Sequence, residues 1–178
     1  MARDLLETGE EAMMFERILV PTDFSSRSDA ALRYGQAIAE RFGASLHLLH
    51  VLEEPLLTGA LGTEIFLPDA QAVHEQIRSN AERMLEERMP PDLRRRRRAT
   101  TDIVVGPCAE AVVTFADDRG MSLIVVGTHA HGSVAHMLVG SVAETIVRKA
   151  SCPVLTVLTP PESSASAKSF AQDVSSRA

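Results

Sequence analysis

The stretch GTHAHGSVAHMLVGSVAE, residues 127–144, contains the residues whose types and spacing best fit ligand chemistry. Three glycines and three histidines lie in it, between the apolar run SLIVV and a segment typical of a helix. Glycines let backbone N–H groups approach a phosphate with no Cβ in the way. Ser141 begins the following helix, and a helix amino terminus favours an anion. A strand, a glycine-rich loop and a helix in this order predict a site for a nucleotide phosphate.

Two familiar nucleotide motifs do not fit this sequence. GTHAHGSV has the G-x-x-x-x-G frame of a P-loop, but Ser133 stands where that motif requires lysine. The first apolar run is followed by VPTDFSS, which has no glycine and so lacks the G-x-G-x-x-G dinucleotide signature. Thr22 and Asp23 nevertheless place polar chemistry directly after that apolar run.

The histidines allow a second interpretation, as metal ligands. His129, His131 and His136 lie close together, and histidine is a common zinc ligand. No cysteine or nearby carboxylate completes a set before residue 144, so a nucleotide site is favoured over a metal site. His47 and His50 differ by an odd number along a predicted strand, so they should face opposite ways and form no joint site.

Composition limits the classes of protein to consider. The 178 residues are enough for one domain with a core, and 45% are hydrophobic. The formal net charge of -6 argues against nucleic acid and anionic membrane as partners. No apolar run approaches the ~20 residues that cross a bilayer, and residues 1–14 lack the pattern of a signal peptide. Two cysteines are too few for a disulfide framework, so we expect a cytoplasmic protein.

One charge run departs from this acidic balance. Residues 94–98 are five consecutive arginines, a pattern found in some nucleic-acid-binding segments. No aromatic residues are interleaved with them, and the run leads into a predicted strand. A solvated edge or a protein contact is therefore the better interpretation.

Strands and helices alternate along the chain. We predict strands at 17–21, 45–51, 97–106, 122–127 and 153–158. Ser26 with Asp29 and Ser141 with Glu144 have the spacing of capping boxes, which predicts that two helices begin there. Gly43 should end the first of these helices, Asp69 should cap the second helix of the chain, and Pro107 should lie in the first turn of the third.

Two predicted helices carry apolar residues at helical spacing, which indicates the faces that they bury. The predicted stripes are Ala31, Tyr34, Ile38 and Phe42 in the first helix, and Val73, Ile77, Ala81 and Met84 or Leu85 in the second.

The predicted strands are apolar without alternation, as in a sheet that is covered on both faces. This pattern predicts a single α/β domain with a parallel, doubly wound sheet, over residues 15–158. Residues 1–14 are expected to be an extension and residues 159–178 a disordered tail. In such folds, ligands bind beyond the carboxyl ends of the strands, where the strand order reverses.

The glycine-rich stretch resembles the ATP-binding motif of the universal stress protein family. That motif is Gly, two residues, Gly, nine residues, Gly, then Ser or Thr; here Gly127, Ala130, Gly140 and Ser141 occupy those places. ILVPTDFS, LHLLHV and ASCPVLTV resemble the first, second and last strands of the family, so the resemblance spans residues 15–158. It implies a Rossmann-like, five-stranded sheet in the order 3-2-1-4-5 and a homodimer formed through the last strand, 153–158.

The resemblance also implies which residues bind ATP, with or without magnesium. Asp23 would contact the adenine or ribose, in a pocket lined by Pro21, Thr22 and Val51. The phosphates and ribose would meet the glycine-rich loop and the helix that follows it. Those residues are Gly127, Thr128, His129, Ala130, His131, Gly132, Gly140, Ser141, Val142 and Ala143.

Ala130 departs from the motif, because the family has glycine there. We expect Ala130 to weaken ATP binding without abolishing it. A left-handed backbone at this position would cost alanine roughly 1–2 kcal/mol relative to glycine. Gly132, two residues further on, gives the loop another flexible position.

Three functions follow from these observations. The first is a cytoplasmic, dimeric stress-response protein that binds an adenine nucleotide as a sensor or regulator. The second keeps the fold and the dimer without the nucleotide, as a protein-interaction module. The third, a slow ATPase, ranks last because the sequence offers no P-loop lysine, obvious base or assembled metal site.

Overall fold

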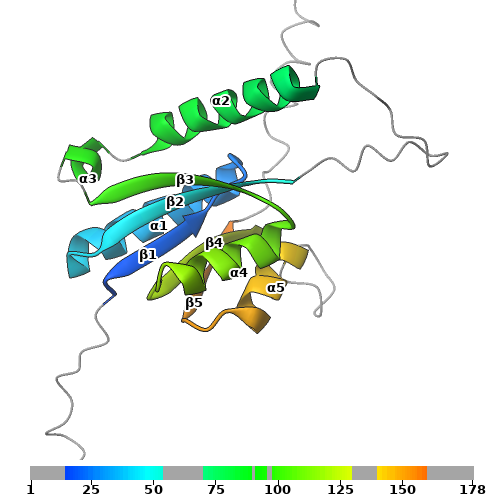
Figure 1. Ribbon diagram of the computed structural model, residues 1–178. Coiled ribbons are helices and arrows are strands. Elements are labelled where there is room, and N and C mark those ends of the chain that lie inside the picture. The colour runs from blue at the N-terminus through cyan, green and yellow to red at the C-terminus, as the bar shows by residue number, and fades with distance from the viewer. Residues whose placement is uncertain (1–14, 54–69, 90, 96–97, 130–139, 160–178) are drawn as a thin grey trace, which may run out of the picture.

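The computed structural model describes residues 15–53, 70–89, 91–95, 98–129 and 140–159. The elements alternate as the sequence predicts (Figure 1). They are, in chain order, β1 (Arg17–Pro21), α1 (Ser26–Phe42), β2 (Ser45–Leu52), α2 (Ala70–Arg88), α3 (Pro91–Arg95), β3 (Ala99–Val105), α4 (Cys108–Asp118), β4 (Leu123–His129), α5 (Ser141–Lys149) and β5 (Val154–Thr159). The short helix α3 was not predicted, and it contains the first two arginines of the run 94–98.

The five strands form one parallel sheet in the order β3-β2-β1-β4-β5, which confirms the predicted fold class. The strand order reverses between β1 and β4, because the chain builds outward from β1 to β3 on one side and from β4 to β5 on the other. The carboxyl ends of β1 and β4 therefore flank the crevice where ligands bind in such folds.

Each face of the sheet has its own hydrophobic core. Ile18 and Val20 of β1 pack with α1 and α2, whereas Leu19 between them packs with α4 and α5. Figure 1 shows α4 and α5 in front of the sheet and α1 behind it. The apolar strands are thus buried on both sides, as their lack of alternation predicts.

The buried face of α1 differs from the predicted stripe. Tyr34 is 57% exposed and Phe42 is 47% exposed. The side of the helix that faces the sheet is made of small residues such as Ala31, Gly35 and Ala39. Ala31, from the predicted stripe, is buried and Ile38 packs against the core, so the stripe is right at these two positions and wrong at Tyr34 and Phe42.

The predicted stripe of α2 is right only in the carboxyl-terminal half of the helix. Ala81 and Leu85 are buried against the sheet, but Val73 is 50% and Ile77 is 44% exposed. Within the described residues, the first half of α2 therefore presents apolar side chains to solvent.

Both predicted capping boxes are wrong, although both helices exist. Ser25 caps α1, since its hydroxyl accepts a hydrogen bond from the N–H of Ser28, and Ser26 is the first residue of the helix. Gly140 occupies the N-cap position of α5, and Ser141 is the first residue of that helix. Gly43 does end α1, with a left-handed φ of 69° that confirms the predicted stop.

Other boundaries differ by a residue or two. Pro107 is the N-cap residue of α4 rather than a member of its first turn. Strand β5 includes Thr159, one residue beyond the predicted domain end. Asp69, the predicted cap of α2, and the extension at 1–14 lie outside the described residues.

Candidate functional site

A pocket of about 290 Å³ lies at the point where the strand order reverses. Ten residues of the predicted nucleotide site line it: Pro21, Thr22, Asp23, Val51, Gly127, Thr128, Gly140, Ser141, Val142 and Ala143. The fold thus brings together segments that are more than a hundred residues apart in the chain. Ala130, His131 and Gly132 lie outside the described residues, as does the side chain of His129.

The pocket is also lined by seven residues that were not predicted from the sequence to be site residues. They are Ser25, Arg27, Ser28, Leu49, His50, Cys108 and Val126. All of them except Cys108 lie within five residues of a predicted site residue in the chain. Cys108 is different, since it comes from the start of α4, and a parallel sheet in this order is needed to bring it here.

Asp23 lies in the turn between β1 and α1. Its Oδ1 atom accepts hydrogen bonds from the N–H of Ser25 at 3.0 Å and from the Ser25 hydroxyl at 2.5 Å. Within the part of the chain that the structure describes, its Oδ2 atom has one distant ion pair, 4.0 Å from an Arg27 nitrogen, and the side chain is 64% exposed. Oδ2 is therefore the oxygen that is more accessible to a ligand hydroxyl or amine.

The carboxyl group of Asp23 is held in its ionised form. Desolvation by burial acts to raise its pKa, but hydrogen bonds from the Ser25 side chain and backbone together outweigh that effect. The resulting pKa lies below the ordinary value, so the group is a hydrogen-bond acceptor at neutral pH.

A small hydrogen-bond network fixes the same turn from inside. The hydroxyl of Thr22, which is 7% exposed, lies 3.0 Å from the Ser28 hydroxyl and accepts a 3.0 Å bond from the N–H of Phe24. The Ser28 hydroxyl donates to the carbonyl of Ser25. Phe24 has a φ of 63°, a left-handed conformation that is rare for a bulky residue and often occurs at functional sites.

His50 closes the pocket from β2. Its Nδ1 atom lies 2.8 Å from the carbonyl oxygen of Thr22. Because a carbonyl only accepts hydrogen bonds, Nδ1 must carry the proton, and Nε2 remains as the second hydrogen-bonding atom of the ring. His47 contacts Thr100 and Ser45 instead, so the two histidines form no joint site, as the sequence predicts.

Gly127 is required first of all by packing. A Cβ atom at this position would lie 2.4 Å from the backbone oxygen of Arg27 and 2.6 Å from its carbonyl carbon. The strand β4 therefore touches the first turn of α1 directly, backbone against backbone. The first glycine of the motif brings the two halves of the pocket together and also lines the pocket.

The amino terminus of α5 forms the opposite wall of the pocket. The N–H of Gly140 donates to the Thr128 hydroxyl at 3.3 Å, which ties the helix start to the end of β4. Gly140 has a φ of -57°, which suits any residue, and among the described residues no side chain caps the helix. Free N–H groups at a helix start are a suitable site for an anion.

Cys108 adds a thiol to the pocket wall. Burial raises its pKa, and the carboxylates of Glu53, Asp23 and Glu110 raise it further, so the thiol is neutral at physiological pH. Both cysteines are free.

Across the described part of the chain, no group of three or more His, Cys, Asp or Glu residues could hold a metal ion.

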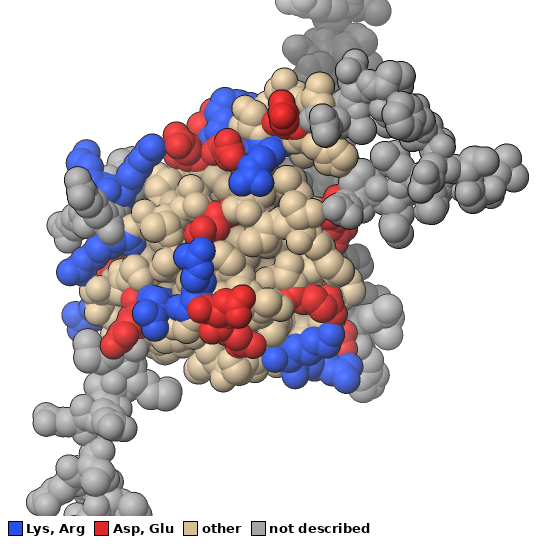
Figure 2. Space-filling model, viewed as in Figure 1, with Lys and Arg blue, Asp and Glu red and all other residues tan. Residues whose placement is uncertain are grey.

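The described arginines of the run, Arg94, Arg95 and Arg98, do not line the pocket. Arg94 pairs with Glu86, Arg95 with Asp92, and Arg98 donates to the carbonyl of Gly43. Figure 2 shows basic side chains gathered at the left of the view, with acidic ones close by. These internal partners favour a solvated edge.

None of the helices that the structure describes is long and apolar enough to cross a membrane.

The fold and the pocket together define a class of protein: a single doubly wound α/β domain with a ligand crevice at its switch point. The model of the universal stress protein family matches residues 14–157. This chain belongs to the universal stress protein family.

Individual relatives agree with this assignment. The chain is 28% identical over 163 residues to universal stress protein MJ0577 of Methanocaldococcus jannaschii, which covers 82% of this chain and 96% of that protein. It is 31% identical over 150 residues to universal stress protein A homolog 1 of Coxiella burnetii, covering 82% and 97%.

Solved structures show the same fold. The structure of MJ0577 superposes with a TM-score of 0.63 at 26% identity, covering 84% of this chain and 99% of that one. A universal stress protein solved in complex with cAMP superposes with a TM-score of 0.55 at 24% identity, covering 82% and 98%. The second likeness concerns the fold alone.

Proposed function

We propose that this protein is a cytoplasmic, dimeric stress-response protein that binds ATP or another adenine nucleotide as a sensor or regulator. The observation that carries the proposal is the pocket at the switch point, lined by ten of the predicted nucleotide-binding residues. A sheet with this strand order offers its ligand site at this place.

The two walls of the pocket have different chemistry, which gives the ligand an orientation. On the β1 side, Asp23 and His50 offer hydrogen-bonding groups that suit a ribose or an adenine. On the opposite side, Gly140 and Ser141 begin a helix whose first N–H groups suit phosphate. We therefore propose that the base and ribose lie against β1 and β2, and the phosphates against α5, with or without magnesium.

Mass spectrometry of the ligand that copurifies with gently isolated protein tests the proposal directly. We expect an adenine nucleotide, and titration calorimetry with ATP should give saturable binding. Asp23→Ala should weaken that binding, and Arg78→Met, a change at an exposed side chain of α2 that does not line the pocket, serves as the control.

Protein that copurifies with no nucleotide and shows no heat with millimolar ATP, with or without magnesium, would contradict the proposal. The nucleotide-free interaction module would then be the better function. Phosphate release by the wild type, compared with the Asp23→Ala variant, tests for slow hydrolysis.

We further propose that the dimer forms through β5. This strand is an edge of the sheet, and its side chains Leu155 and Leu158 are 37% and 60% exposed. An exposed apolar edge strand favours pairing with another chain, and a two-fold axis would pair β5 with its own copy.

A further inference from the structure

Among the described residues, Arg88 of helix α2 contacts the turn between β1 and α1, which lies next to the nucleotide pocket. Arg88, the last residue of α2, donates from Nε to Oδ1 of Asp29 at 2.9 Å and from a terminal nitrogen to the carbonyl of Phe24 at 3.1 Å. The arginine side chain is only 24% exposed. The pair also joins a cation in the last turn of α2 to a carboxylate in the first turn of α1, as both helix dipoles favour.

Arg88 also contacts the Phe24 ring, which in turn contacts the His50 ring at the pocket. Its guanidinium carbon lies 5.1 Å from the centroid of the Phe24 ring, within the range of a cation–π contact. The Phe24 ring in turn lies 4.3 Å from the His50 ring, centroid to centroid, with the planes tilted by 33°. His50 lines the pocket and donates to the Thr22 carbonyl.

Phe24 is the strained member of this chain of contacts. Its φ of 63° is costly for a bulky side chain and persists only where the surroundings enforce it. Arg88 contacts Phe24 twice, at its carbonyl and over its ring. Thr22 and Asp23 directly precede Phe24, and the N–H of Phe24 donates to the Thr22 hydroxyl, so Phe24 belongs to the same turn as these two pocket residues.

We propose that Arg88 is a positioning residue for the nucleotide pocket. It holds the Phe24 turn in its left-handed conformation, so that Thr22, Asp23 and His50 face the ligand. The inference rests on the proposed nucleotide function. Its consequence is that the docking of α2 and the binding of nucleotide are coupled, and that each stabilises the other by the same factor.

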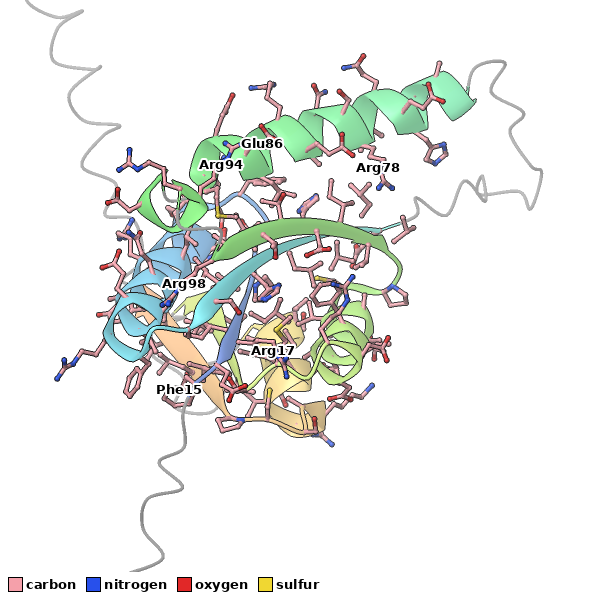
Figure 3. All side chains as sticks on the ribbon, turned by 60° about the vertical axis from the view of Figure 1, so that its left-hand side comes forward. Phe15, Arg17, Arg78, Glu86, Arg94 and Arg98 are labelled. Atoms are coloured by element: carbon pink, nitrogen blue, oxygen red, sulfur yellow. The ribbon has the colours of Figure 1, made fainter. Side chains whose placement is uncertain are left out.

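The first test compares Arg88→Met with a matched control on the same helix. Arg78, on the amino-terminal half of α2 (Figure 3), pairs with Glu82, and both side chains are more than half exposed. We expect Arg88→Met to weaken ATP binding by about tenfold or more, since it removes charge-assisted hydrogen bonds. Arg78→Met should leave the affinity unchanged, and Arg88→Lys should restore part of it.

A second measurement, by NMR, distinguishes a positioning role of Arg88 from a general loss of stability in the Arg88→Met variant. In the nucleotide-free protein at fixed pH, the ring signals of His50 in NMR spectra should move in Arg88→Met, while those of His47 stay in place. Equal ATP affinity in the wild type and Arg88→Met, or unmoved His50 signals, would overturn the inference.

The third test relieves the backbone strain at Phe24, whose φ is 63°. Glycine adopts a φ of 63° without a steric penalty, so Phe24→Gly should make the turn less dependent on Arg88. We expect the loss of ATP affinity on Arg88→Met to be smaller in the Phe24→Gly background than in the wild type. An equal loss in both backgrounds would show that Arg88 does not act through the turn.

The experiments distinguish a failure of the proposed nucleotide function from a failure of the Arg88 inference. A wild-type protein that binds no adenine nucleotide contradicts that function, whereas the His50 signals still decide whether Arg88 positions the turn.

Discussion

At the scale of single residues, Asp23 carries the clearest chemical role. One of its oxygens accepts hydrogen bonds from Ser25, while the other lies 4.0 Å from an Arg27 nitrogen. We expect Asp23→Ala to weaken ATP binding by about tenfold or more, because a hydrogen bond to a charged group contributes about 1.5–3 kcal/mol. Titration calorimetry measures this loss, and unchanged affinity would remove Asp23 from the site.

Asp23 also gives stability a dependence on pH. Because its folded pKa is lowered, the carboxylate stabilises the folded state above its unfolded value of 3.8, and that contribution is lost as the pH falls through the folded pKa. Thermal unfolding of the wild type and Asp23→Asn should differ most at pH 5–7 and converge in strong acid. A difference that grows on acidification would contradict the assigned sign.

Gly127 should be intolerant of any side chain. In Gly127→Ala, the new Cβ would overlap the backbone of Arg27, which cannot move aside as a flexible side chain could. We expect a loss of about 1–3 kcal/mol or more in the free energy of unfolding, measured with urea. Gly140→Ala is the control, since its φ of -57° suits alanine, and it should cost about 1 kcal/mol or less.

Ala130 lies outside the described residues, so its effect stays a prediction from the sequence. If the second motif position needs a left-handed backbone, Ala130→Gly should raise ATP affinity by up to about tenfold. Titrating both forms with ATP measures this. Binding by the glycine variant alone would show that Ala130 has switched the site off.

At the scale of elements, α2 is divided into a packed half and an exposed half. Leu85 is 1% exposed, whereas Ile77 is 44% exposed. Leu85→Ala should therefore cost about 2–5 kcal/mol of unfolding free energy, and Ile77→Ala clearly less. Similar losses in the two variants would show that the amino-terminal half of α2 is also covered in solution.

At the scale of the whole molecule, the exposed edge β5 predicts a dimer. Leu158→Lys should place a charge on that edge and yield monomers, as measured by light scattering at micromolar concentration. Val73→Lys is the control, because Val73 is 50% exposed on α2, a helix that packs on β2 and β3 at the other side of the sheet. A Leu158→Lys variant that remains dimeric would place the interface elsewhere.

The C-terminal residues 160–178 follow that strand. We expect their deletion to leave the dimer intact, because β5 itself supplies the predicted interface. Light scattering of the truncated chain measures this, and a monomeric product would assign the interface to those residues.

The sequence by itself determined the order of the elements and the fold class. Continuous apolar runs indicate strands that are buried on both faces, and a chain that alternates such strands with helices has few topologies open to it. Residues such as Asp23 and Gly127 were found as well, because polar or glycine-rich chemistry directly after a buried strand is a local pattern. Both lie in the pocket.

Only the tertiary structure decided which distant residues meet. Cys108 enters the pocket because parallel strands bring their carboxyl ends to one edge. Arg88 reaches the Phe24 turn because α2 packs on β2 and β3, on the face of the sheet that α1 also covers. The buried face of α1 was predicted only in part, since Ala31 is buried and Ile38 packs against the core, whereas Tyr34 fits the helical period and is exposed. Such contacts depend on how backbones pack against one another, and no pattern within a single segment records them.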